Sequence, residues 1–154
     1  MWIRYIPTKV FNALQRKGRE KLKNTYDYTG RNKFPTVNFT TVNKNKANLT
    51  AEEQEKEDEK RKFPTVYLQK LQGQPRGRTL EDTKVNAILS SFQIEVVTNT
   101  NQTDAEIIAD VLADIMIDMG FDMVGEPFPD NDYDTYRNIS RWQRLIGYNE
   151  KLNF

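Results

Sequence analysis

The chain has 154 residues, enough for one ordinary domain with a real core, and its mean hydropathy is −0.79. It contains no Cys and no His, which excludes disulfides, thiolate metal sites and the usual Ser-His or Cys-His catalysis. No run approaches the roughly 18 apolar residues of a membrane span, and the first residues lack the apolar run of a secretory signal. Because only 37% of the residues are hydrophobic, part of the chain is expected to lie in solvent or against a partner.

The net charge of +1 hides a strong asymmetry between the two halves of the chain. Residues 1–78 carry 18 Lys or Arg and 8 Asp or Glu, a net +10, whereas residues 79–154 carry 5 and 14, a net −9. This division is typical of an internal charge match, of two faces with different partners, or of a basic face that meets the acidic face of the next identical copy. Charge alone does not choose among these interpretations.

Residues 8–24 have the spacing of an amphipathic helix, with Thr8 as its N-cap. One stripe is apolar and the remaining surface is crowded with Lys and Arg, although Gly18 weakens the helical pattern. The apolar stripe consists of Val10, Phe11, Leu14 and Leu22. We interpret the basic face as a solvated surface, with a contact to nucleic acid or to an acidic neighbour as the alternative.

Two segments share the string FPTV and favour strands through their β-branched and aromatic residues: residues 34–42 and the segment that begins at Phe63. Pro at the second position suits the start or edge of a strand, so we expect two strands of one sheet with similar starts. Between them, residues 43–62 offer almost nothing to bury, which predicts an exposed charged insertion, with a recognition arm as the alternative. Thr50 and Glu53 fit a capping box there.

Turn-forming residues predict a loop over residues 72–84, namely Gly73, Pro75 and Gly77. A long strand is expected to follow at 85–98. Apolar residues at alternate positions there suit a strand with one buried face. That face is expected to hold Ile88, Phe92, Ile94 and Val96.

The clearest predicted element is a helix over 104–119. Thr103 and Glu106 form a capping box at its start, and Gly120 suits the position just past its end. Its broad apolar stripe consists of Ile107, Ile108, Val111, Leu112, Ile115 and Met119. Along one flank of this stripe, Asp residues recur every four positions, at Asp110, Asp114 and Asp118.

The chain after residue 120 gives mixed signals. A strand is expected to begin at 121–124, and residues 126–134 form a turn rich in Pro and Asp. For residues 135–146 the apolar spacing favours a helix, whereas the β-branched and aromatic residues favour a strand. Periodicity does not decide between these two structures.

Alternating carboxylates in the string DNDYD, from Asp130 to Asp134, resemble the start of a calcium loop. Such a loop needs Gly at its sixth position and Glu at its twelfth, where this chain has Thr135 and Arg141. A polar turn is therefore the preferred interpretation. The chain also has no Walker loop, no GxSxG and no dinucleotide fingerprint, so we expect neither an enzyme nor a cofactor.

Two charged groups are candidates for a subunit interface. Arg76 and Arg78 flank a glycine on the predicted loop, where they suit carboxylates of a neighbour or, less readily, phosphates. The row formed by Asp110, Asp114 and Asp118 suits a solvated or subunit-facing surface better than a metal site, because like charges four residues apart repel unless an external cation offsets them.

The stretch FPTVYLQKLQGQPRGRTLEDTKVNAILSSFQIEV, residues 63–96, resembles small tail proteins of long-tailed bacteriophages of Gram-positive hosts, often called minor capsid or tail terminator proteins. The order that follows is similar too: an acid-capped helix, a strand from Phe121, then DTYRNISRWQRLIG. The resemblance covers roughly residues 8–24 and 63–147. The charged segment 43–62 departs from the pattern.

This resemblance implies an α+β fold for residues 1–154 as a single domain: a mixed, largely antiparallel sheet of about four to five strands flanked by two helices, with a strand at 135–146. It also implies a structural protein of the virion neck that forms a homohexameric ring, caps the tail tube, ends tube polymerisation and docks on the head-completion (stopper) ring. Its implied partners are itself, the major tail tube protein and the stopper protein. Viral DNA would pass through the ring without sequence-specific binding, and no membrane is involved.

Overall fold

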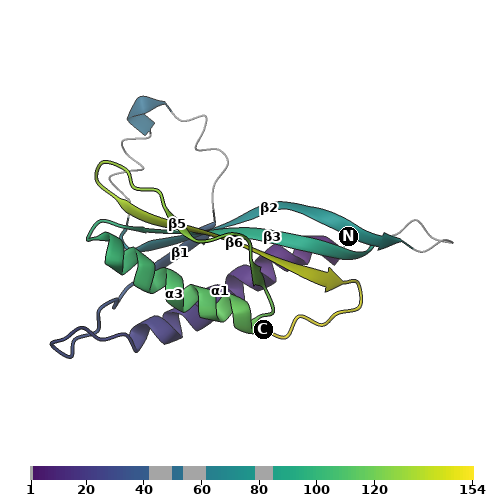
Figure 1. Cartoon of the computed structure of the whole chain (residues 1–154), viewed down its shortest axis with the longest axis horizontal. Helices are drawn as coiled ribbons and strands as arrows, with labels where there is room; N and C mark the ends of the chain where they lie inside the picture. Colours follow the sequence, from purple (N-terminus) through teal and green to yellow (C-terminus); the bar gives the residue numbers. More distant parts are fainter. Residues whose placement is uncertain (1, 42–49, 54–61, 79–84) are drawn as a thin grey trace.

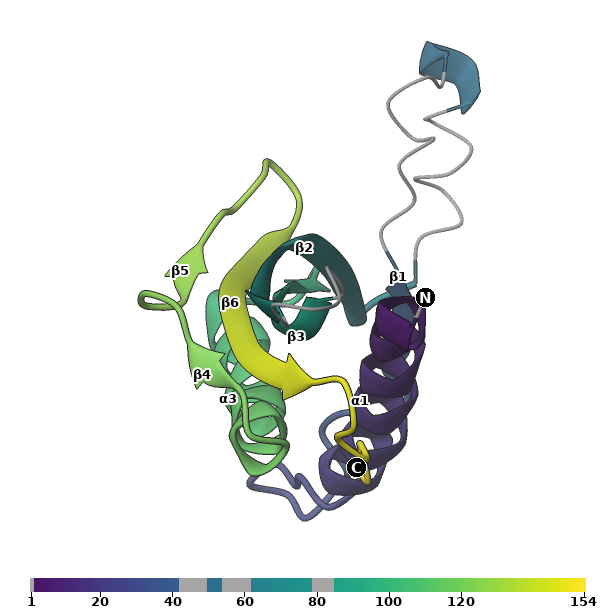
Figure 2. The same cartoon turned by 90° about the vertical axis from the view of Figure 1, so that its right-hand side faces the viewer.

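The structure is a computed structural model that describes residues 2–41, 50–53, 62–78 and 85–154. It has the expected α+β fold, a mixed and mostly antiparallel sheet with both long helices on the same side of it (Figures 1 and 2). The elements are a 3-10 turn (Trp2–Tyr5), α1 (Ile6–Lys23), β1 (Asn38–Thr41), β2 (Thr65–Arg78), β3 (Val85–Thr98), α3 (Gln102–Asp118), β4 (Asp122–Met123), β5 (Phe128–Pro129) and β6 (Tyr136–Gly147). Among the described residues, no helix is long and apolar enough to cross a membrane.

The strands are ordered β1-β2-β3-β6-β4, with β5 also paired to β6. Within the described residues the sheet has six strands instead of the expected four to five, because the short β4 and β5 both add to the free side of β6. β1 and β2 run parallel, and the other pairs are antiparallel. β3 pairs with β6 continuously from Ala87↔Gly147 to Thr98↔Tyr136, which makes residues 136–147 a strand and not a helix. Backbone pairing along the whole segment outweighs its helical spacing.

The core lies between the sheet and the two helices. From β3 it receives the four residues that alternation predicts, and Phe92 packs edge-to-face against Phe121 with ring centroids 5.7 Å apart. From β6 it receives Trp142, which is fully buried. The predicted stripes of both helices face this core, although Phe11 of the α1 stripe and Ile107 and Val111 of the α3 stripe are only partly buried. Met116, which the predicted stripe omitted, is buried as well.

Gly18 allows α1 to approach its neighbours closely. A Cβ atom at this position would lie 2.7 Å from Cζ of Phe39 on β1 and 3.2 Å from Cδ2 of Leu112 on α3. The glycine that weakened the helical pattern is therefore the contact point between α1, β1 and α3. Glycine has a lower helix propensity than alanine, but a larger residue at this position would force the three elements apart.

The helix boundaries differ from the predicted ones at both N-termini. α3 begins after Asn101, whose Oδ1 accepts the Asp104 N–H at 2.8 Å, so Thr103 is not the cap. α1 begins at Ile6 without a side-chain cap, so the Thr8 prediction is also wrong. Gly120 follows the end of α3 with φ +85°, as predicted, because a residue there adopts the left-handed conformation.

The predicted loop at 72–84 is wrong for residues 72–78, which continue β2. The register of β2 against β3 shifts between Leu71 and Gln74, so the glycine between them is absorbed in a bulge while pairing resumes beyond it. Residues 79–84 lie outside the described part of the chain. So does most of the insertion 43–62. In its described part, residues 51–53 are helical and exposed, and Thr50 Oγ1 accepts the Glu53 N–H at 3.2 Å, which is one half of the expected capping box.

Candidate functional site

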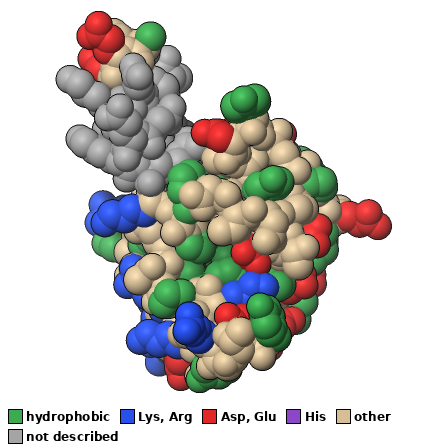
Figure 3. Space-filling model, turned by 90° about the vertical axis from the view of Figure 1, so that its left-hand side faces the viewer, with side chains coloured by type: hydrophobic (Ala, Val, Ile, Leu, Met, Phe, Trp, Pro, Cys, Tyr) green, Lys and Arg blue, Asp and Glu red, His purple; other side chains and the backbone are tan. Residues whose placement is uncertain are grey.

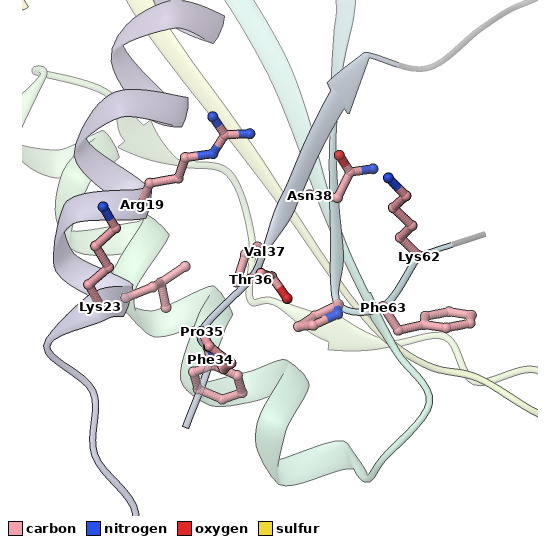
Figure 4. Close-up of a pocket in the computed structure, with 11 residues that line it drawn as sticks. Arg19, Lys23, Phe34, Pro35, Thr36, Val37, Asn38, Lys62 and Phe63 are labelled. Atoms are coloured by element: carbon pink, nitrogen blue, oxygen red, sulfur yellow. The ribbon is translucent and has the colours of Figure 1, made fainter. Parts of the chain in front are cut away.

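A pocket of about 400 Å³ lies where the end of α1 meets the segments that lead into β1 and β2 (Figure 4). Arg19 and Lys23 reach it from α1, and Lys62 approaches from the opposite side. Its apolar lining includes the buried side chains of Leu22, Phe34 and Val37. Among the residues that the structure describes, no carboxylate contributes to the lining. We refer to it as the basic pocket.

The repeated FPTV string builds the floor of the basic pocket. Pro35 and Pro64 have no N–H to donate to a ladder, and the strands begin only after them, at Asn38 and Thr65. The two strand starts lie side by side because β1 and β2 are parallel, and the Asn38 N–H donates to the Pro64 carbonyl at 3.0 Å. The first expected strand therefore starts four residues later than predicted, and the displaced residues 34–37 line a pocket.

The cations of the basic pocket are available to an anion. Within the described part of the chain, Arg19, Lys23 and Lys62 make no ion pair, and all three are exposed. The Arg19 guanidinium lies 5.8 Å from the ring centroid of Phe39, which holds it over the pocket side of α1. Three unneutralised cations beside an apolar floor suit a ligand that carries both carboxylates and an apolar group.

At the opposite edge of the sheet, residues 124–134 form a loop that contains β5, which we call the acidic loop. Its residues are all exposed, and it carries four carboxylates and no Lys or Arg. These carboxylates belong to Glu126, Asp130, Asp132 and Asp134. The side chain of Tyr133 is fully exposed, with a relative accessibility of 106%.

The acidic surface continues from this loop onto α3. Glu106 and Asp110 of α3 and Glu126 of the loop surround a hollow of about 340 Å³. Its wall includes Asn138, whose buried Oδ1 has no hydrogen-bond partner. Among the described residues, no group of His, Cys, Asp or Glu is arranged to hold a metal ion. The hollow is therefore best described as part of a negatively charged surface.

The predicted interface residues lie on two different elements, the arginines on β2 and the carboxylates on α3. Arg76 is exposed on β2, roughly 35–40 Å along the strand from the basic pocket by the usual rise per residue. Of Arg78, the structure describes the backbone pairing with Val85. On α3, Asp110 and Asp114 are exposed, and Asp118 lies 3.8 Å from Lys21 of α1.

A turn after α1 leads the chain toward the basic pocket. The Asp27 carboxylate accepts hydrogen bonds from the Thr29 hydroxyl at 2.6 Å and from the N–H groups of Thr29 and Arg31. These bonds, the one from the Thr29 hydroxyl above all, lower the pKa of Asp27 below its ordinary value. The exposed carboxylate thus shapes the turn.

No protein-family model matches the chain, and no curated protein matches its sequence. Neither the basic pocket nor the exposure of Tyr133 is among the features predicted from the sequence. The signal for the pocket is the FPTV repeat, which by itself predicts two strand starts. The signal for the loop is the turn rich in Pro and Asp, which by itself predicts a polar turn.

Proposed function

We propose that this chain is the structural subunit of a phage tail terminator. Six copies form a ring that caps the tail tube, ends tube polymerisation and joins the tail to the head-completion ring. The subunit acts in the neck of the virion after assembly in the host cytoplasm. Its partners are further copies of itself, the major tail tube protein and the stopper protein, and viral DNA passes through the ring without sequence-specific contacts. No catalytic step or cofactor is part of this function.

The observation that carries the proposal is the separation of charge between two sides of the molecule. At one end, most Lys and Arg lie on the side of α1 and β1, and most Asp and Glu lie on the side of α3 (Figure 3). Rings are built from heterologous contacts, in which one surface meets a different surface of the next copy. Two lateral surfaces of opposite charge support such a contact. The order of the sequence elements, which resembles that of phage tail proteins, supports a place for this contact in a phage tail.

The mass of the protein under native conditions tests the proposal. We expect six copies of the 18.1 kDa chain. A chain that stays monomeric and shifts DNA in a gel contradicts the ring. The alternative is another neck component, such as the stopper, and electron micrographs of particles that lack the protein distinguish the two functions. Tails of uncontrolled length support the terminator. Normal tails that fail to join heads support the other component.

A nucleic-acid-binding module is the second candidate, favoured by the exposed cations of α1. These are Lys9, Arg16, Arg19, Lys21 and Lys23. Phosphate binding by such a face produces an affinity that falls steeply with salt. Binding of duplex DNA by a monomer, with this salt dependence and loss on reversal of the α1 charges, would replace the ring proposal.

The sequence-based pairing of Arg76 and Arg78 with Asp110, Asp114 and Asp118 of a neighbour remains a prediction. Exposed charge pairs act mainly on the rate of association and are screened by salt. If this pairing contributes to assembly, reversal of the charges of Arg76 and Arg78 slows ring formation at low salt. Adding Asp114→Lys then restores the rate of ring formation. Unchanged assembly kinetics at low and high salt would exclude the pairing.

A further inference from the structure

The acidic loop and the basic pocket have opposite charges and lie at opposite edges of the sheet. The loop belongs to the edge formed by β4 and β5, and β1 lies at the other edge (Figure 2). The residues that line the pocket include Asn38, the first residue of β1. We propose that the acidic loop of one copy inserts Tyr133 into the basic pocket of the next copy, and that this contact links the subunits. The inference rests on the proposed ring and names the residues that join it.

The side chain of Tyr133 is exposed and can contact a partner surface. It is fully exposed, and Phe128 in the same loop is 40% exposed. Tyrosine is suited to such contacts because its ring is apolar and its hydroxyl remains hydrogen-bonded. Tyr28 is equally exposed, but its loop carries Arg31 and Lys33 against the one carboxylate of Asp27, so its net charge has the same sign as the pocket.

The acidic loop is held in place by its own chain. The Asp130 N–H donates to the Arg137 carbonyl at 3.2 Å, and the Asp132 N–H donates to the Thr135 carbonyl at 3.0 Å. Asp132 also pairs with the Arg137 guanidinium at 2.7 Å. These contacts leave Tyr133 projecting from a preformed loop, so less conformational entropy is lost when a partner binds it.

The size, apolar lining and charge of the basic pocket suit the acidic loop. Its volume of about 400 Å³ falls within the range of ~300–1,000 Å³ for pockets that bind small molecules, enough for one aromatic side chain and its neighbours. The ring of Tyr133 would pack on Phe34 and its apolar neighbours. The pocket cations Lys23 and Lys62 would face the loop carboxylates, which fixes the register of the contact.

A second copy of the chain fits this pocket better than an unrelated acidic partner. Each copy carries one loop and one pocket at opposite sheet edges, so every subunit can donate once and accept once, as a ring requires. The charges are also matched across the whole sequence, with a net +10 before residue 79 and a net −9 from there on.

Mixing two assembly-deficient variants tests the inference. The pocket variant carries Lys23→Glu and Lys62→Glu, and the loop variant carries Tyr133→Ala and Asp134→Asn. Each variant alone is expected to lose the hexamer and sediment as a monomer. A mixture should form a 1:1 heterodimer and stop there, because only the loop of the pocket variant and the pocket of the loop variant remain intact.

Matched variants control for charge and for loss of an exposed aromatic ring. Lys9→Glu with Lys70→Glu removes two exposed cations outside the pocket, and Tyr28→Ala with Glu20→Gln alters an exposed tyrosine and a carboxylate outside the loop. Both control variants should keep the hexamer. Hexamers that persist in the pocket and loop variants overturn the inference and leave the proposed ring standing. An unmodified chain that stays monomeric overturns both.

Disulfide cross-linking gives a second, independent readout. The chain has no cysteine, so Tyr133→Cys combined with Thr36→Cys, an exposed residue that lines the pocket, introduces one reactive site on each surface. Oxidation of the assembled protein should produce a ladder of up to six linked chains, whereas each single substitution should not. An assembled hexamer that gives no ladder rules out this contact.

Discussion

The two long helices fulfil the same structural role with opposite surface charges. Both pack an apolar stripe against the same face of the sheet (Figure 2), and they contact each other near Gly18. The exposed face of α1 is mainly basic, whereas α3 exposes Glu106, Asp110, Asp114 and Asp118. Where the helices come close, Lys21 and Asp118 lie 3.8 Å apart, and both side chains remain about half or more exposed.

The comparison of the two helices distinguishes the features that stabilise the fold from the surface charges that are left for partners. Burial of the stripes stabilises the fold whatever the sign of the charges, since burial of one aliphatic side chain contributes ~1.5–3 kcal/mol and an exposed ion pair only ~0–1 kcal/mol. The opposite charges of the two helices are therefore available for assembly. Substitutions on each helix test this division, from the largest expected effect to the smallest.

Truncation of the α3 stripe should have the largest effect. Ile115 is 1% exposed, so Ile115→Ala is expected to lower the free energy of unfolding by ~2–5 kcal/mol, through lost burial and the cavity that it leaves. Ile117 on the same helix is 56% exposed and provides the control, because Ile117→Ala should change stability by less than ~0.5 kcal/mol. Denaturant midpoints measure both, and equal midpoints would show that the stripe does not face the core.

Closing the space at Gly18 should have the next largest effect. Gly18→Ala gains about 1 kcal/mol in helix propensity but overpacks Phe39 and Leu112, which typically costs ~1–3 kcal/mol, so we expect net destabilisation. The melting temperature should fall by roughly 2–4 °C for each kcal/mol lost. Adding Phe39→Leu should recover part of the loss. Gly147→Ala is the control, since a Cβ there meets nothing within 4 Å, and a stabilised Gly18→Ala would refute the close approach.

The half-buried polar contact at the start of α3 should matter less than its core. Asp104 accepts the Thr100 hydroxyl at 2.6 Å and lies 3.0 Å from Nζ of Lys33. Asp104→Asn removes the charge, and we expect the free energy of unfolding to fall by ~1–2 kcal/mol. This is the lower end of the range for hydrogen bonds to charged groups, because the Lys33 side chain is 30% exposed. Asp114→Asn, at an exposed position on the same helix, should be neutral in the same denaturation assay.

The ion pair between the helices should have the smallest effect. The side chains of Lys21 and Asp118 are 47% and 69% exposed, so a double-mutant cycle with Lys21→Met and Asp118→Asn should give a coupling energy of ~0–1 kcal/mol. The coupling should vanish in 1 M salt, where the Debye length is ~3 Å. A larger coupling that resists salt would mean that charge sign does contribute to the fold.

The elements predicted best are those whose pattern is repeated over many residues. The strand expected at 85–98 is β3, Val85–Thr98, and the helix expected at 104–119 overlaps nearly all of α3, Gln102–Asp118. Alternation and 3.6-residue spacing are local consequences of backbone geometry, so they are visible in the sequence alone. The cap of α3 was less predictable, because Asn101 and Thr103 are both good capping residues only two positions apart.

The sequence by itself determined the strand at 85–98, the helix at 104–119, the apolar stripes and the division of charge, since these depend on residue type and short-range spacing. The tertiary structure alone decided that residues 72–78 continue β2 past two glycines and a proline, and that residues 136–147 form a strand, because each outcome depends on pairing with β3. It alone assembled the basic pocket, whose residues come from three separate segments, 19–23, 34–38 and 62–64. Such a site exists only once parallel pairing of β1 and β2 places the two FPTV strings beside the end of α1.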